Sequence, residues 1–302
     1  MEYILTTDAL TKTYKNFKAL NGFSMHVPKG AIYGFVGKNG AGKTTLIRLI
    51  CGLQEPSSGE YTLYGRVRNA KDIAKSRRRM GAVVETPSIY LDMTAYENLR
   101  EQYDILGLPS YDGIEELLRL TGLADTGKKK AKNFSLGMRQ RLGIALAGDP
   151  DFLVLDEPAN GLDPQGIVEI RELILKLNRE YQITVLISSH ILDELSRLAT
   201  HYGFIDHGQM VKEISREELE AACGKCTHVR VSDTQTLSQV LDSMNLKYSI
   251  HSETEADIYA EITISKLTLA LAEKSCELYT VQEKEESLES YYISLVGGLR
   301  HD

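Results

Sequence analysis

A glycine-rich loop between a strand-like run and a helix-like run most constrains how this chain can fold. Residues 31–36 (AIYGFV) are almost continuously apolar, which predicts a strand buried on both faces of a sheet. Residues 37–44 (GKNGAGKT) then match the pattern G-x-x-x-x-G-K-[ST], and a helix pattern begins at Gly42. This order predicts a phosphate-binding loop, because glycines let several backbone N–H groups approach an anion at a helix N-terminus.

The loop also supplies the side chains that a nucleotide triphosphate requires. Lys43 is expected to reach the β- and γ-phosphates, and the hydroxyl of Thr44 is expected to ligate Mg²⁺. The alternative, an accidental glycine-rich turn, is disfavoured by the flanking strand and helix. The predicted ATP-binding positions of this segment are Gly37, Asn39, Gly40, Ala41, Gly42, Lys43, Thr44 and Thr45.

A second strand-like run ends in two acidic residues. Residues 152–155 (FLVL) are apolar and are followed by Asp156 and Glu157. Adjacent carboxylates at the end of a buried strand are costly unless they have a role. Asp156 is placed to hold Mg²⁺ through water, and Glu157 is placed to polarise an attacking water. The alternative is a pair of acids that cap a helix. Together with the phosphate loop, the pair predicts a P-loop nucleotide hydrolase.

The remaining pattern predicts an α/β fold with a helical insertion. Strand-like runs alternate with helix-like runs, which is typical of a mostly parallel sheet. Between about residues 86 and 150 the pattern becomes helical instead. Thr94 and Glu97 have the spacing of a capping box, Gly107 ends that helix, and Ser135 opens another.

The last part of the chain has a different pattern. Strand-like, helix-like and strand-like runs cover 227–231, 237–244 and 247–250, followed by an alternating strand at 258–262, a helix at 266–273 and a strand at 279–281. This β-α-β-β-α-β order predicts a small ferredoxin-like α+β domain. We therefore expect a first domain over residues 1–219 and an accessory domain over 220–302, with a final amphipathic helix at 288–296.

Four further motifs resemble those of the ATP-binding-cassette (ABC) ATPases. Residues 133–142 (NFSLGMRQRL) are similar to the signature motif, or C-loop, and stand just upstream of the acidic strand as in that family. Residues 160–163 (NGLD) resemble the D-loop, and residues 188–190 (SSH) resemble the H-loop. Tyr14 precedes the phosphate loop at a spacing that suits the aromatic residue that stacks on adenine. The resemblance covers about residues 2–215.

The resemblance implies a role for each matching residue. Ser135 and Gly137 would bind the γ-phosphate held by a second copy in a head-to-tail dimer, and Asp163 would also border the nucleotide. His190 would contact the γ-phosphate and would act with Glu157 and Lys43 in catalysis. The family also implies ATP and Mg²⁺ as cofactors and membrane-spanning permease subunits as partners.

Two departures from the family pattern stand out. Glu85 occupies the position where the family normally has Gln, and it is expected to ligate Mg²⁺ beside Thr44 and Asp156. Leu136 and Met138 replace the Gly and Gln of the usual signature motif. These features are similar to those of the bacitracin-resistance and lantibiotic-immunity branch of ABC exporters.

Composition narrows the function further. A net charge of −7 and a pI near 5.6 argue against a nucleic-acid or anionic-lipid partner. The sequence offers no apolar stretch long enough to cross a bilayer and no signal peptide at its start. Cys223 and Cys226 have metal-like spacing but lack companion ligands, so reduced thiols are favoured. We expect a cytoplasmic protein held at the inner face of the membrane by its permease.

Three functions remain open at this level. The first is the ATPase subunit of an exporter of a peptide antibiotic or related amphiphile. The second is the ATPase subunit of an importer, and the third is a soluble ABC ATPase of DNA repair or translation. The stretch between Lys43 and Ser135 is too short for the coiled coil of repair types, and the chain holds one cassette rather than the two of translation types.

Overall fold

The computed structural model describes residues 2–148, 150–222, 225–260 and 262–285, together with residues 288, 291, 292 and 295. The chain divides into two compact units, Met1–Arg216 and Glu217–Asp302. The sequence pattern places the boundary after residue 219, which falls within helix α8 (Arg216–Ala222).

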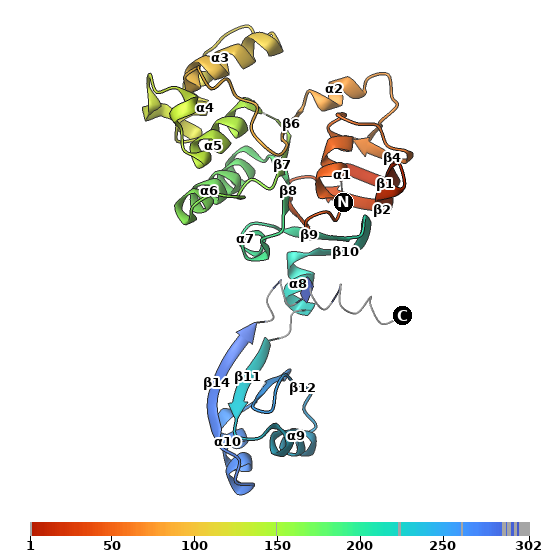
Figure 1. Ribbon diagram of the computed structural model, residues 1–302, viewed down its shortest axis with the longest axis vertical. Helices are drawn as coiled ribbons and strands as arrows, with labels where there is room; N and C mark the ends of the chain where they lie inside the picture. The colour runs from red at the N-terminus through yellow and green to blue at the C-terminus, as the bar shows by residue number, and fades with distance from the viewer. Residues whose placement is uncertain are drawn as a thin grey trace. The chain divides into compact units, whose positions relative to one another are not determined.

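A six-stranded sheet forms the centre of the first unit, in the order β10-β9-β3-β8-β7-β6 (Figure 1). Neighbouring strands in this sheet pair in parallel, except for β9 and β10, which form an antiparallel hairpin. The carboxyl ends of β3, β7 and β8 therefore meet at one edge of the sheet, where ligands bind in open α/β folds. The strands are β3 (Ile32–Val36), β6 (Met80–Val83), β7 (Phe152–Asp156), β8 (Thr184–Ser189), β9 (His201–Asp206) and β10 (Gln209–Ser215).

Helices cover both faces of this sheet. Strands β3, β7 and β8 are buried at every position, because α1 (Lys43–Ile50) packs with Phe152 and Val154 on one face and α6 (Pro164–Tyr181) lies on the other. A short helix, α7 (Leu192–Ser196), follows β8. This arrangement confirms the predicted α/β class and explains the continuous apolar runs in the sequence.

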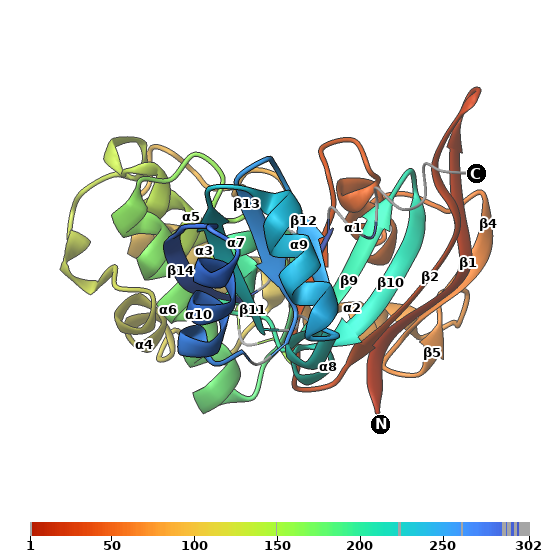
Figure 2. The same cartoon turned by 90° about the horizontal axis from the view of Figure 1, so that it is seen from below.

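A second, antiparallel sheet of order β2-β1-β4-β5 lies beside β10 and is well seen in Figure 2. Its strands are β1 (Tyr3–Tyr14), β2 (Phe17–Pro28), β4 (Ser58–Leu63) and β5 (Arg66–Val67). Strands β1 and β2 are each 12 residues long. Register shifts near Leu10 and Lys12 break the alternation of apolar and polar residues, so the pattern is lost along half of the hairpin.

The helical insertion follows β6 and a short helix, α2 (Ile73–Arg77), and lies on the opposite side of the first unit from β1 and β2 in Figure 1. It contains α3 (Ala95–Leu106), α4 (Ile114–Leu120) and α5 (Leu136–Leu146) with its own apolar core. The predicted capping box is confirmed, since Thr94 accepts from the amide of Glu97 and Glu97 accepts from the amide of Thr94. Gly107 ends α3 in the left-handed conformation, and Ser135 caps α5, both as predicted.

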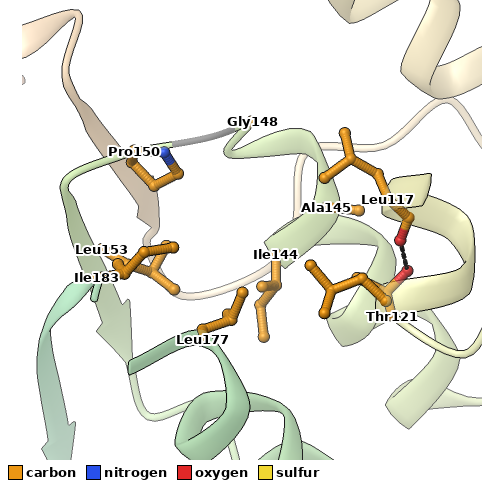
Figure 3. A pocket seen from close by; sticks show the side chains of 10 residues that line it. Leu117, Thr121, Ile144, Ala145, Gly148, Pro150, Leu153, Leu177 and Ile183 are labelled. Atoms are coloured by element: carbon orange, nitrogen blue, oxygen red, sulfur yellow. Dashed lines mark hydrogen bonds between the residues drawn. The ribbon is translucent and has the colours of Figure 1, made fainter. Parts of the chain in front are cut away.

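An apolar seam joins the insertion to the central sheet (Figure 3). Side chains from α4, α5, β7 and α6 converge there around a small cavity. Ile144 of α5 and Leu177 of α6 both line it, as does Leu153 of β7. Apolar side chains from the insertion and from the central sheet and α6 therefore pack together in this seam.

The second unit contains a four-stranded antiparallel sheet in the order β12-β13-β11-β14. Helices α9 (Thr234–Ser243) and α10 (Ile264–Glu273) lie side by side (Figure 2) and bury their apolar faces against Val229, Val231 and Ile258. This is the predicted ferredoxin-like topology. The strands are β11 (Lys225–Val231), β12 (Tyr248–Ile250), β13 (Glu255–Ile258) and β14 (Leu278–Glu285).

Two predictions for the end of the chain remain to be compared with the structure: one differs from it, and the other falls mostly on residues that the structure does not describe. Strand β13 ends at Ile258, so the alternation at residues 258–262 predicted a strand too far along the chain. Most of the amphipathic helix predicted at 288–296 lies outside the described residues, as does Cys223. In the described part of the chain, no helix combines the length and apolar character needed to span a membrane.

Candidate active site

The phosphate loop connects β3 to α1 at the carboxyl edge of the central sheet. Gly42 has a φ of 115°, and a Cβ there would lie 2.5 Å from the carbonyl oxygen of Ala19, so only glycine fits. A Cβ on Gly37 would lie 2.6 Å from a methyl carbon of Ile205. The glycines therefore let the loop pass closely over its neighbours while its amides remain available at the start of α1.

Lys43 is held inside this loop. Its side chain is only 5% exposed, and its Nζ donates to the carbonyl oxygens of Gly37 at 2.5 Å and Lys38 at 3.3 Å. The same Nζ lies 3.1 Å from Oε1 of Glu157. Two carbonyl oxygens and one carboxylate therefore hold Nζ of Lys43 at the phosphate loop, where a bound phosphate could replace the carboxylate.

The acidic pair is fixed by the neighbouring strand. Asp156 is buried at the end of β7, and its Oδ1 accepts a 2.6 Å hydrogen bond from the hydroxyl of Ser188 on β8. The amide of Glu157 donates to the hydroxyl of Ser188 at 3.0 Å and to its carbonyl oxygen at 3.1 Å. Glu157 has a φ of 50°, a strained value for a residue with a side chain.

The structure brings the three predicted catalytic residues into contact. Oε2 of Glu157 lies 2.6 Å from Nδ1 of His190, while Oε1 faces Lys43. Both neighbours can carry positive charge, and the carboxylate of Glu157 is 19% exposed. Glu157 is thus positioned by two side chains that come from the phosphate loop and from the loop after β8.

Tyr14 lies at the tip of the β1–β2 hairpin. Its hydroxyl donates to Oε1 of Gln54, which follows α1, and Nζ of Lys12 lies 5.2 Å from the centre of its ring. The side chain is partly exposed. These contacts tie the hairpin tip to the segment after the phosphate helix.

Ser135 and Asp163 each cap their own helix. Oγ of Ser135 accepts from the amide of Met138 at 3.2 Å, and Oδ1 of Asp163 accepts from the amide of Gly166 at 2.9 Å. A Cβ on Gly137 would meet Gly166 and Leu162 at ordinary contact distances, so the N-termini of α5 and α6 are neighbours. Among the described residues, no hydrogen bond or ion pair links Ser135 or Asp163 to Lys43 or Glu157.

Glu85 follows β6 and contacts a basic residue. Its carboxylate forms an ion pair with the guanidinium of Arg48 on α1, and its side chain is 57% exposed. Its φ is 61°. The structure therefore places the predicted metal ligand beside α1, paired with Arg48 rather than with Lys43.

Two residues near the acids were not singled out by the sequence. Ser188 was noted only as part of the SSH motif, although its hydroxyl joins Asp156 to the backbone of Glu157. Cys51 ends α1, and burial raises the pKa of its thiol to about 12, with the nearby Asp156 adding to the rise. A thiol in that state is unreactive at neutral pH.

The order of the strands, the phosphate loop and the acidic strand end define a P-loop ATPase of the cassette type. A family described as ABC transporter matches residues 20–160. The bacitracin transport ATP-binding protein BcrA of Bacillus licheniformis is 40% identical over 99% of this chain and 99% of its own length. The lantibiotic transport ATP-binding protein SrtF of Streptococcus pyogenes is 41% identical over 70% of this chain and 90% of its own. The chain belongs to the ABC transporter family.

Solved structures agree with this assignment. A dimeric ATP-binding cassette in a post-hydrolysis state, bound to ADP and phosphate, superposes with a TM-score of 0.63 at 25% identity. The superposition covers 70% of this chain and 98% of the solved chain. The cbiO1 protein of Clostridium perfringens, part of the ABC transporter complex cbiONQ, gives a TM-score of 0.65 at 25% identity, covering 81% of this chain and 97% of that chain.

Proposed function

We propose that this chain is the ATP-hydrolysing subunit of an exporter of a peptide antibiotic or a related amphiphile. The observation that carries the proposal is the cluster of Lys43, Glu157 and His190 at the phosphate loop. The names of BcrA and SrtF, which refer to bacitracin and lantibiotic transport, support the substrate class. The subunit would work in the cytoplasm, at the inner face of the membrane.

In this proposal the ion pair between Lys43 and Glu157 is a resting state. An ATP γ-phosphate would compete for Nζ of Lys43, because a phosphate carries more negative charge than one carboxylate. Glu157 would then be free to take a proton from the attacking water. His190, at 2.6 Å, would hold the carboxylate in place and would contact the γ-phosphate.

The residues present fit a magnesium ion bound together with phosphates. No group of three or more His, Cys, Asp or Glu side chains in the described ranges is arranged to hold a metal by itself. Mg²⁺ usually takes only one or two carboxylates plus substrate phosphates and waters. The hydroxyl of Thr44 and the carboxylate of Asp156 would supply the protein ligands, with Glu85 as a third candidate. The ion would neutralise charge on the transferred phosphoryl group.

The second half of the nucleotide site would come from another copy. Ser135 and Gly137 start α5, and the free amides there suit a phosphate. Asp163, at the start of α6, would border the same nucleotide. Tyr14 would stack on the adenine through the ring face that Lys12 leaves open. The loop residues Gly37, Asn39, Gly40, Ala41, Gly42, Lys43, Thr44 and Thr45 would enclose the phosphates.

The permease would dock on the helical insertion. Apolar side chains at and just after the end of α3 are exposed: 63% for Ile105, 52% for Leu106 and 44% for Leu108. They border a groove of about 700 Å³ that continues between the insertion and Tyr181 of α6. An amphipathic helix of the membrane partner is the occupant that such a groove fits best.

The test uses Glu157→Gln in the full chain. We expect ATP binding to persist, turnover to fall by about 10²–10⁴-fold, and the protein to become an ATP-dependent dimer. ATPase rates measure the turnover, and sedimentation with and without Mg-ATP measures the formation of the dimer. Hydrolysis at the parental rate would exclude Glu157 as the general base.

A further inference from the structure

The tip of the β1–β2 hairpin is hydrogen-bonded to the segment that follows the phosphate helix α1. The amide of Thr13 donates to Oγ of Ser57 at 3.0 Å, and the amide of Ser57 donates to the carbonyl oxygen of Thr11 at 2.8 Å. The hydroxyl of Tyr14 donates to Oε1 of Gln54. These bonds join the hairpin tip to the end of α1, the helix that begins at the phosphate loop.

Lys12 adds a contact of a different kind. Its Nζ donates to the carbonyl oxygen of Glu55 at 2.6 Å and lies over one face of the Tyr14 ring, 5.2 Å from the ring centre. The carboxylate of Glu55 has another partner, because it pairs with Arg68 at 2.8 Å. In the described part of the chain, no carboxylate forms an ion pair with Lys12, so one carbonyl oxygen and one ring face hold its half-buried side chain.

The contact with Lys12 constrains how the Tyr14 ring can meet a ligand. A cation over an aromatic ring is attracted to the negative face of the π-system, so the contact favours one orientation of the ring. The face under Lys12 is closed to other groups, which leaves the opposite face for a nucleotide base. Because 38% of Tyr14 remains exposed, the ring is still accessible to a ligand.

Two contacts together order the Tyr14 side chain before any ligand is bound. Gln54 fixes the hydroxyl at the end of the side chain, and Lys12 fixes one face of the ring. A side chain at a hairpin tip would otherwise lose rotational freedom when a base stacks on it. A side chain that is already ordered avoids this cost, which increases the affinity for the ligand.

We propose that Lys12 is a positioning residue for the nucleotide base, which holds the Tyr14 ring in the orientation on which the base stacks. The inference rests on the proposed function, because it assumes that Tyr14 meets the base of a nucleotide whose phosphates occupy the phosphate loop. Lys12 acts through the ring and not through the phosphates. Its contribution to binding therefore requires a base in the ligand and an aromatic ring at residue 14.

Calorimetric titrations of the full chain with two ligands separate the base from the phosphates. Mg-ADP carries both and stays intact during the measurement, whereas Mg-pyrophosphate carries the phosphates alone. Lys12→Met keeps a long side chain but removes the charge and the hydrogen-bond donor. It should weaken the binding of Mg-ADP about two- to fivefold, the range open to an exposed cation–π contact, and should leave the affinity for Mg-pyrophosphate unchanged.

Two further variants distinguish positioning of the ring from a change in net charge. Lys12→Arg keeps a cation and a donor, so it should bind Mg-ADP like the parent. Lys18→Met is the matched control, because Lys18 lies on the same hairpin and its Nζ donates to Asn21 at 3.4 Å. It removes the same charge and should change neither affinity.

A double-mutant cycle tests whether Lys12 acts through Tyr14. Tyr14→Leu removes the ring and should itself weaken the binding of Mg-ADP. In that background Lys12→Met should cause no further loss, because two residues that act through one contact have effects that do not add.

Several results would overturn the proposal. Parental binding of Mg-ADP by Lys12→Met or by Tyr14→Leu would do so, as would an equal loss of affinity for Mg-pyrophosphate. Losses that add in the double variant, or a loss in Lys12→Arg or Lys18→Met as large as in Lys12→Met, would have the same meaning. In all these cases the proposed function stands. If the parent binds neither ligand, the phosphate loop is wrongly assigned, and the proposed function fails together with this inference.

Discussion

The hydroxyl of Ser188 donates to Oδ1 of Asp156 at 2.6 Å while it accepts from the backbone amide of Glu157 at 3.0 Å. One buried side chain therefore fixes both members of the acidic pair. Ser188→Ala would leave a buried carboxylate without this donor, so we expect the free energy of unfolding to fall by about 1–3 kcal/mol. ATP turnover should fall with it, because Glu157 loses an anchor. Chemical denaturation and steady-state ATPase assays measure the two effects.

Ser189→Ala is the control for this prediction. Among the described residues, the hydrogen bonds of the Ser189 hydroxyl are made with the backbone of Ile191 and not with Asp156 or Glu157. Equal losses of turnover in the two variants would show that the Ser188 hydrogen bonds have no special role.

Glu85 lies in the segment that joins β6 to the helical insertion, and substitutions there test whether this segment affects hydrolysis stimulated by the permease. Glu85→Gln keeps an oxygen ligand but loses the ion pair with Arg48, whereas Glu85→Ala loses both. We expect both variants to bind ATP, the first to change permease-stimulated hydrolysis and the second to lose the stimulation. ATPase rates of the chain with and without its co-purified permease decide the matter. Unchanged stimulated rates in both variants would make Glu85 an ordinary surface acid.

Removal of the second unit should leave the nucleotide site intact. The first compact unit ends at Arg216, and every residue proposed to contact ATP precedes it. A chain that stops after Arg216 should therefore bind Mg-ATP with close to full affinity, which a calorimetric titration can measure. If such a chain is folded by circular dichroism but does not bind ATP, the accessory role of residues 217–302 is wrong.

The second unit should lose stability in acid for an identifiable reason. Burial raises the pKa of Asp257, but hydrogen bonds from His228 and His251 outweigh this, and the pKa lies below its usual value. The stabilisation is therefore present above the unfolded-state value of about 3.9 and is lost as pH falls through the lower folded-state pKa.

Asp257→Asn should remove about 1 kcal/mol of stability at pH 7 and flatten this acid dependence. Hydrogen exchange at the amides of β11 and β13, followed at pH 7 and pH 3, measures the change. Asp242→Asn, which affects an exposed bond to Tyr248, is the control. An unchanged acid profile in Asp257→Asn would assign the pH dependence to other groups.

The features that could be predicted from the sequence share one property: each depends on residues that are close together in the sequence. The phosphate loop, the acidic strand end and the caps at Thr94 and Ser135 are local patterns, so spacing alone located them. The contact of Lys43, Glu157 and His190 also followed, because parallel strands bring their carboxyl ends to one edge. Register shifts hid the length of β1 and β2, since a bulge interrupts the alternation on which a strand assignment depends.

The pairing of Glu85 with Arg48 could not be predicted in this way. It joins residues far apart in the sequence and depends on a positive φ at Glu85, which the residue type does not suggest. The two hydrogen bonds of the Ser188 hydroxyl could not be predicted either, because they depend on the register of β8 against β7.

The left-handed backbone of Glu157 also has an evolutionary consequence. A glycine would occupy a φ of 50° without strain, and an asparagine would do so with less, yet neither could serve as a general base. Selection for turnover at this position therefore opposes selection for stability. Lineages that abandon hydrolysis but keep nucleotide binding are expected to drift toward glycine or asparagine at residue 157, and those that keep a carboxylate there are expected to remain active.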